Sequence, residues 1–338
     1  MIKDNISRDI QEVDARNGQK FRSKFRPKDR EGEESSKVRQ PCGFPELSED
    51  GSSVLQTEVS PKTARRGPLN KNALFRLDQQ LTDRDKTVLA SLKKYRFLLT
   101  GQLQRLHFYA PPNETARATA TTRTLRRLRE YGLIQTLERR VGGARSGSGS
   151  MIWHLTEAGY RFLQLHQPEE QGRTPVKEPS TQFLAHTLSV AECAIQMESI
   201  CRPSKDLDVI KLETEPPCWR SFQENGKTVI LKPDLYAVTR YDGYEDYWFM
   251  EVDLGTESTS QVTDKCKVYR RYFFTEMEQA ENDVFPLVVC IVPDEKRKEK
   301  LKAAIRSALP PDPKMFLIIT PDQLERMLRQ FIGSEEMC

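Results

Sequence analysis

The sequence predicts a protein of two domains, the first of the α+β class and the second of the α/β class. The chain has 338 residues, enough for two compact domains of roughly 150 residues each. Residues 73–167 show helical periodicity followed by two short strand patterns, and residues 180–333 alternate apolar strands with amphipathic helices. Residues 168–179 are rich in Pro, Glu and Gln and predict a linker between the two domains.

Composition excludes several classes of protein. No segment approaches the ~18 apolar residues that a membrane helix needs, and the first residues lack the apolar core of a secretory signal. The seven cysteines form no CxxC pair and the four histidines no HExxH motif, so we expect neither a zinc knuckle nor a disulfide framework. The net charge of +4 is too small to indicate nucleic-acid binding by itself. We expect a cytoplasmic protein with reduced thiols and no membrane association.

Residues 1–72 predict a disordered tail of basic and polar character. Charged and small residues dominate it, and its sparse apolar residues show no sustained period. Its Lys and Arg clusters are expected either to be solvated or to contact nucleic acid or a partner.

The first predicted domain has the elements of a winged helix-turn-helix, in the right order. We expect Asp83 to cap the first helix, Thr100 the second, and Asn113 or Thr115 the third, which ends at Gly132. A short strand, the basic turn ERRVGGARSGSGS and a returning strand, MIWHLT, follow. LRRLREYGLI and WHLTEAG, on either side of that turn, resemble the same part of many bacterial winged-helix domains. The pattern predicts a winged helix with its third helix in the DNA major groove.

Positive charge gathers on the two elements with which this fold contacts DNA. The third helix carries Arg117, Arg123, Arg126, Arg127 and Arg129, and the wing carries Arg139, Arg140 and Arg145. A solvated helix face is the alternative interpretation. We expect contacts with DNA phosphates, which weaken as salt concentration rises.

The second predicted domain begins with an amphipathic helix at residues 181–200. Three strands follow, VIKLETE, KTVILKPDLYAVTR and EDYWFMEVDL, and then the helix STSQVTDKCKVYRRYFFTEM. The apolar runs FPLVVCIV and MFLIIT predict buried strands, each followed by a helix. This order predicts an α/β sheet with helices on its faces.

Three carboxylates interrupt the apolar strands of this domain. Asp234 follows a proline, while Glu251 and Asp253 lie at the end of a strand. Residues two apart on a strand share a face, so this pair would repel unless a cation lies nearby. Mg²⁺ or Mn²⁺ takes oxygen ligands and could activate water for phosphodiester hydrolysis. The alternatives are that Asp234 shapes a turn and that the other two pair with Lys or Arg in a structural ion network.

The Pro-Asp pair ending at Asp234, with Glu251 17 residues further on, resembles the restriction-endonuclease-like PD-(D/E)xK core. Asp253 stands where that pattern has a lysine, so we expect the lysine to come from the following helix, where Lys267 and Lys265 are the candidates and Lys267 is preferred. The resemblance implies that Asp234, Glu251 and Asp253 are metal ligands. It also implies that Lys267 stabilises charge on the phosphate or orients the attacking water.

Taken together, the winged helix and the segments LAHTLSV, KPDLYA, FMEVDLGTES and KCKVYRRYF are similar to the replication-relaxation family, over about residues 75 to 330. That family includes plasmid relaxases of the MobC type. The resemblance implies a DNA-binding protein of a plasmid or mobile element that nicks DNA with Mg²⁺ or Mn²⁺, in company with other relaxosome or replication proteins. The alternatives are a degenerate nuclease fold that serves as a docking platform and a defence-associated nuclease.

Five further residues near these motifs are secondary candidates. Glu257 could reach the same site, and Glu192 is a weaker candidate. We expect His186 to close a contact between helix and sheet. Tyr269 and Tyr272 are expected to pack the helix or contact the DNA backbone, because tyrosine nucleophiles of relaxases work beside a three-histidine metal cluster. No heptad pattern predicts the oligomeric state.

Overall fold

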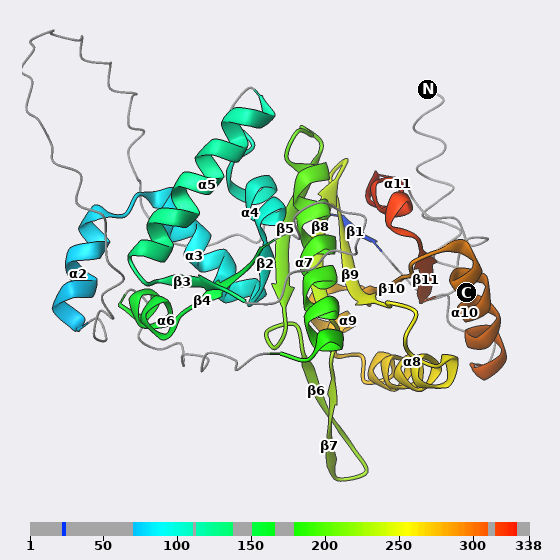
Figure 1. Ribbon diagram of the computed structural model, residues 1–338. Coiled ribbons are helices and arrows are strands. Elements are labelled where there is room, and N and C mark those ends of the chain that lie inside the picture. The colour runs from blue at the N-terminus through cyan, green and yellow to red at the C-terminus, as the bar shows by residue number, and fades with distance from the viewer. Residues whose placement is uncertain are drawn as a thin grey trace, which may run out of the picture.

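The computed structural model describes five segments of the chain with their side chains and one further segment by its backbone alone. These are residues 70–110, 113–137, 151–165, 179–309 and 315–329, with the backbone of 22–24. Helices and strands are mixed throughout, and the described strands form three sheets (Figure 1). None of the described helices combines the length and the apolar character needed to cross a membrane.

The first part of the fold is mainly helical, with a small antiparallel sheet in the order β2-β4-β3. Its elements are α2 (Lys71–Gln80), α3 (Asp83–Tyr95), β2 (Leu98–Leu99), α4 (Thr100–His107), α5 (Glu114–Glu130), β3 (Ile134–Thr136), β4 (Ile152–Leu155) and α6 (Glu157–Gln164). The basic turn between β3 and β4 lies outside the described residues.

Helix caps explain where α3 and α5 begin. The N-cap of α3 is Thr82, so the prediction of Asp83 was wrong by one residue. Thr82 and Asp85 form a capping box, in which the Thr82 amide donates to the Asp85 carboxylate at 2.9 Å and the Asp85 amide donates to the Thr82 hydroxyl at 3.3 Å. Asn113 caps α5 as predicted, and Gly132 follows its end with a φ of 75°.

Thr100 is the first residue of α4, and the N-cap position belongs to Leu99. The prediction of Thr100 as the cap was therefore wrong. Its hydroxyl accepts a hydrogen bond from the Trp153 indole at 2.9 Å, which joins α4 to β4.

The second part is built on a mixed sheet in the order β11-β10-β9-β8-β5. Its elements are α7 (Thr181–Cys201), β5 (Leu207–Thr214), β6 (Arg220–Glu224), β7 (Lys227–Leu231), β8 (Leu235–Tyr241), β9 (Tyr244–Val252), α8 (Thr259–Phe273), α9 (Met277–Asn282), β10 (Leu287–Ile291), α10 (Glu295–Ala308), β11 (Phe316–Ile319), η1 (Pro321–Gln323) and α11 (Leu324–Arg329). Strand β10 runs parallel to β9 and β11, whereas β5, β8 and β9 are antiparallel.

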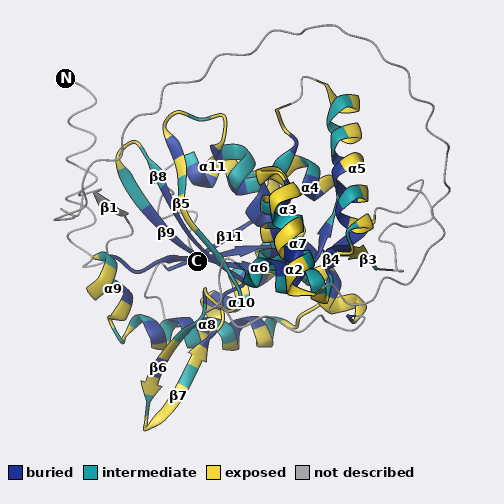
Figure 2. Cartoon of the chain, turned by 90° about the vertical axis from the view of Figure 1, so that its left-hand side faces the viewer, coloured by how far each residue is buried: buried dark blue, intermediate teal, exposed yellow. Residues whose placement is uncertain are grey.

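Alternation along the strands separates two layers of helices. Ala237 and Met250 belong to the core that includes α7 and α11, and Val238 and Phe249 belong to the core that includes α8 and α10. Figure 1 shows α7 crossing one face of the sheet, and Figure 2 shows the buried strands between exposed helix surfaces. This arrangement agrees with the predicted sheet with helices on its faces.

The segment predicted as one strand, residues 227–240, is two strands. Strand β7 pairs with β6, whereas β8 pairs with β5 and β9. The strand breaks between them because Pro233 lacks the N–H that a continuous ladder needs. Strands β6 and β7 form a hairpin that projects from the body (Figure 1). Asn225 and Gly226 at its tip have φ values of 49° and 73°, as a tight two-residue hairpin turn requires. Strand β6 was not predicted from the sequence.

Helix α7 packs against both parts of the fold. Leu184 and Leu188 share a buried cluster with Phe97 and Ile152 of the first part. The Gln102 side chain donates to the Leu188 carbonyl at 3.0 Å. Polar contacts extend this packing, as described below for Glu192. The predicted linker lies almost wholly outside the described residues.

Within the predicted tail, the structure describes one strand, β1 (Arg22–Lys24), which pairs antiparallel with residues 244–246 of β9. Helix α2 begins at Lys71, just before the predicted start of the first domain. Residues 1–21 and 25–69 lie outside the described residues.

Candidate functional site

Two of the predicted carboxylates meet where β8 begins and β9 ends. Leu235 pairs with Met250 across these strands, which places Asp234 beside Glu251. The Asp234 amide donates to the Met250 carbonyl at 3.1 Å. Both side chains are buried, with exposed fractions of 4% for Asp234 and 8% for Glu251. The break at Pro233 thus places the Asp234 carboxylate just before a buried strand, next to the Glu251 carboxylate.

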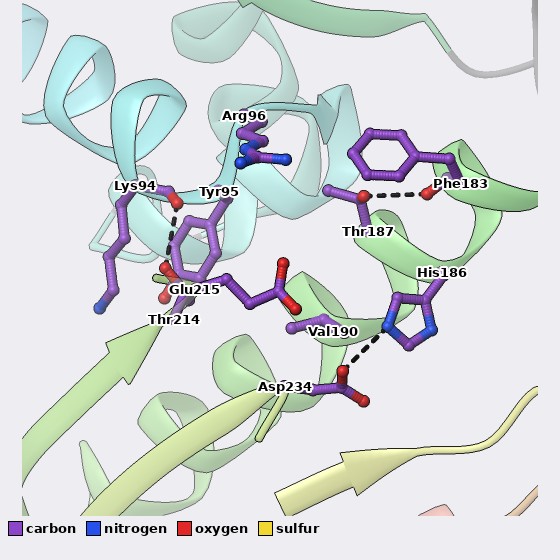
Figure 3. Close-up of a pocket in the computed structure, with 10 residues that line it drawn as sticks. All are labelled: Lys94, Tyr95, Arg96, Phe183, His186, Thr187, Val190, Thr214, Glu215 and Asp234. Atoms are coloured by element: carbon purple, nitrogen blue, oxygen red, sulfur yellow. Dashed lines mark hydrogen bonds and ion pairs between the residues drawn. The ribbon is translucent and has the colours of Figure 1, made fainter. Parts of the chain in front are cut away.

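Asp234 is held as a charged carboxylate by groups on either side of it. His186 Nε2 of α7 lies 3.1 Å from Oδ1 (Figure 3). The Val252 amide donates to Oδ2 at 2.8 Å. Burial alone would raise the pKa of Asp234, but the His186 hydrogen bond and the Lys265 charge outweigh it and lower that pKa. The same hydrogen bond raises the pKa of His186 against the opposing effect of burial. His186 makes the predicted contact between helix and sheet.

Glu251 accepts hydrogen bonds from two residues of α8. The Lys265 ammonium contacts Oε2, and the Tyr269 hydroxyl donates to Oε1 at 2.5 Å. Burial raises the pKa of Glu251, even though the Lys265 charge lowers it. Burial lowers the pKa of Lys265, but the carboxylates of Glu251 and Asp234 raise it overall. The cluster therefore contains two carboxyl groups and a persistent ammonium charge.

The lysine of this cluster is Lys265, which corrects the preference for Lys267. Lys267 is half exposed and binds Asp264 at 2.7 Å. The reason is helix geometry: Val262 and Tyr269 are buried on α8, and Lys265 lies one turn from each of them, whereas Lys267 lies on the opposite side. The spacing of the apolar residues along this helix was the sequence signal that places Lys265, and not Lys267, toward the cluster.

Asp253 has a cation of its own. It lies on the same side of the sheet as Glu251, as alternation predicts, but its Oδ2 accepts from Arg297 Nε of α10 at 2.6 Å. Its Oδ1 accepts from the Gly255 amide at 2.7 Å. Arg297 also donates to the Glu257 carbonyl at 2.7 Å, so it ties α10 to the loop that leads into α8. At Asp253 the structure therefore has the structural ion pair that the sequence offered as an alternative to a metal ligand. Arg297 was not among the residues predicted from the sequence.

The cluster lines a cavity of about 440 Å³, counting its part open to solvent. Its polar lining comes from His186, Asp234, Glu251, Asp253, Glu257, Lys265 and Tyr269. Glu192 lies elsewhere, paired with Arg105 of α4 at 2.6 Å. Among the residues that the structure describes, no group of three or more His, Cys, Asp or Glu side chains is arranged to hold a metal ion.

The two tyrosines of α8 pack as predicted. Tyr269 and Tyr272 are almost fully buried, and the Tyr272 hydroxyl donates to Glu278 at 3.0 Å. Burial and the nearby carboxylates raise the pKa of both phenols, which keeps them protonated.

The predicted DNA-contacting arginines divide into four groups. Arg123, Arg126 and Arg129 are exposed at three-residue intervals along α5. Arg127 instead binds the buried carboxylate of Asp85, at 2.6 and 2.8 Å, and joins α5 to the start of α3. Arg117 is half-buried. Arg139, Arg140 and Arg145 fall outside the described residues.

Comparison with known proteins identifies the family. A search of curated proteins and a search of solved structures each found no match. The profile of the replication-relaxation family matches residues 89–288. That match covers more than half of the chain, from α3 to β10, and includes Asp234, Glu251 and Lys265. The chain is therefore a member of the replication-relaxation family.

Proposed function

We propose that this protein is a DNA-nicking endonuclease that acts in the replication or mobilisation of a plasmid or other mobile element. The observation that carries the proposal is the convergence on one cavity of Asp234, just before β8, Glu251 of β9 and Lys265 of α8. The family match supports the biological setting. Two carboxylates and a lysine are the groups that metal-dependent phosphodiester hydrolysis uses.

The donor set fits one Mg²⁺ or Mn²⁺ ion held by Asp234 and Glu251. Each of their four oxygens accepts one hydrogen bond in the structure, and a carboxylate oxygen has a second lone pair for a cation. Mg²⁺ commonly takes only one or two protein carboxylates and completes its coordination with water and substrate phosphate. When bound there, the ion would supply activated water and neutralise phosphate charge. Asp253 is left out of this set because Arg297 binds it.

The residues around the two carboxylates have separate tasks in this proposal. His186 and the Val252 amide fix the direction of the Asp234 carboxylate. Tyr269 orients Glu251 from the buried side. Lys265 presents its ammonium to the cavity, where it would stabilise negative charge that develops on the phosphate in the transition state.

DNA binding is assigned to the first part of the fold. Three helices followed by two antiparallel strands, in residues 83–155, support the winged-helix interpretation. Arg123, Arg126 and Arg129 would contact phosphates from the exposed side of α5. Replacing all three by Ala should weaken duplex binding and reduce the slope of log affinity against log salt by about 3. A mobility-shift titration at several salt concentrations measures this.

The nuclease proposal is tested by nicking of supercoiled plasmid in Mg²⁺ or Mn²⁺. Wild type is compared with Asp234→Asn and Glu251→Gln, which keep the side-chain shapes. We expect relaxed circles from wild type and a loss of at least about 100-fold in each variant. Chelation with EDTA should abolish nicking by wild type while DNA binding persists. Equal nicking by wild type and both variants would refute the assigned site.

A second candidate is a non-hydrolytic DNA-binding factor that uses the same surface for docking. It is favoured by one observation: each of the three carboxylates already has a basic protein partner, namely His186, Lys265 or Arg297. In that case plasmid would remain supercoiled with wild type, and Asp234→Asn would retain full function in plasmid mobilisation or replication.

A further inference from the structure

A second cavity adjoins the proposed catalytic cluster. It encloses about 420 Å³, counting its part open to solvent, and lies between the end of α3, the first half of α7 and the end of β5. Figure 3 shows Lys94 and Arg96 on one side, Phe183 and His186 on the other, and Asp234 at the edge. Since His186 and Asp234 line both cavities, a molecule bound at the cluster can extend directly into this second space.

Arg96 enters this cavity from a strained turn. Its φ of 66° and ψ of −53° are those of a γ-turn, and the Phe97 amide donates to the Tyr95 carbonyl at 2.7 Å across it. Residues other than glycine rarely adopt this conformation, and such strain concentrates where a side chain serves binding. The Arg96 guanidinium lies 5.8 Å from the centre of the Phe183 ring.

The lining suits one nucleotide better than a duplex. Phe183 keeps 36% of its surface exposed, which leaves a ring on which a base can stack. The Arg96 cation suits a phosphate, whereas the Lys94 ammonium points away from Arg96 and Phe183 (Figure 3). The Glu215 carboxylate also lines the cavity and favours the amino group of a base, because carboxylates accept hydrogen bonds from such groups. A space of this volume is too small to admit a double helix.

We propose that this cavity binds an unpaired nucleotide next to the phosphate that is cut, so that the substrate is single-stranded or locally melted DNA. Phe183 stacks on the base, and Arg96 holds the adjoining phosphate. This inference rests on the proposed function, because it takes the cluster of Asp234, Glu251 and Lys265 to be the cutting site.

The test measures DNA binding in EDTA, where no nicking can interfere. The probes are a fluorescein-labelled single strand of mixed sequence, of about 20 nucleotides, and the same strand in a duplex. Phe183→Ala should weaken single-strand binding about 5- to 100-fold and leave duplex binding unchanged. Phe183→Trp should retain affinity, and its added tryptophan emission should be quenched by the single strand. Phe274→Ala removes a more exposed aromatic from the end of α8, outside this cavity, and should change neither affinity.

Arg96→Gly separates binding from folding. Glycine accepts the positive φ, so this variant should melt at or above the temperature of wild type. It should nevertheless bind single-stranded DNA more weakly, and the slope of log affinity against log salt concentration should be reduced by about 0.7. Equal losses on single strand and duplex, or no loss in Phe183→Ala and Arg96→Gly, would overturn the inference. If plasmid stays uncut but these two variants behave as expected, the nuclease proposal fails, and the cavity remains a site for an unpaired nucleotide without a cut beside it.

Discussion

His107 is a residue whose burial makes stability depend on pH. Burial, together with the nearby charges of Arg202 and Arg84, lowers its pKa from 6.5 to about 4. Its Nε2 lies 3.0 Å from the Ser91 hydroxyl. Because the folded state keeps this imidazole neutral, its contribution is complete above pH 6.5 and is lost as pH falls toward 4.

We therefore expect wild type to lose about 2 kcal/mol of stability between pH 7 and pH 5 through this group. His107→Gln keeps a hydrogen-bonding side chain near Ser91 and cannot titrate, so its loss over the same interval should be smaller by about that amount. Urea unfolding of both proteins at the two pH values measures the difference. Parallel losses would show that His107 does not cause the pH dependence.

At the same scale, single residues show what the sequence could and could not predict. Asp234 and Glu251 were predictable because charges in apolar strands need partners. The choice between Lys265 and Lys267 depended on the phase of α8, which the buried positions Val262 and Tyr269 define. Arg297 could not be predicted, since it lies 44 residues from Asp253 and reaches it only through the packing of α10.

At the scale of elements, Arg297 fixes the connection between β9 and α8. It binds the Asp253 carboxylate and the Glu257 carbonyl, and both charged side chains are nearly buried. Arg297→Met should destabilise the protein by about 3 kcal/mol, because it leaves Asp253 buried without a cation. The double variant with Asp253→Asn should recover part of that loss. Lys300→Met, at an exposed position of the same helix, should cost within about 0.5 kcal/mol in urea unfolding.

A different result would reassign this ion pair. If Arg297→Met unfolds at the same urea concentration as wild type, the contact does not hold the loop. If the double variant is less stable than Arg297→Met alone, the burial of an unpaired Asp253 is not the cause.

Elements themselves were predicted unevenly. The buried strands β10 and β11 follow from continuous apolar runs, and α10 follows from its charged and apolar period. Strand β6 has a single apolar residue, Phe222, which is also its only buried residue, so it carries little periodic signal. The split between β7 and β8 was visible in Pro233, which removes a donor from the ladder.

For the whole molecule, α7 makes the two parts one packed unit. A single hydrophobic cluster runs from Leu89 of α3 through Ile195 of α7 to Met250 of the sheet. Two predicted domains in sequence are thus joined by a shared helix rather than by a linker alone. The order of the parts was predictable, but this packing was not, because the partners of α7 lie up to about 100 residues away.

We expect one cooperative unfolding transition for both parts. Trp153 reports on the first part and Trp248 on the sheet. Variants that each retain only one of these two tryptophans, with Trp219 also replaced by Phe, should show coincident urea midpoints after correction for their stabilities. Leu188→Ala should lower both urea midpoints together, because it should reduce the free energy of unfolding by about 2 to 5 kcal/mol. Midpoints that separate would mean that the parts unfold independently.

In the proposed function, the cluster of Asp234, Glu251 and Lys265 cuts DNA. The most direct measurement compares plasmid nicking rates of Lys265→Met and Lys267→Met, two substitutions of the same kind two residues apart on α8. We predict that Lys265→Met nicks at least about 100-fold more slowly than wild type, with unchanged DNA affinity, and that Lys267→Met nicks at the wild-type rate. Equal nicking rates in the two variants, or a loss confined to Lys267→Met, would refute this assignment of the cutting site.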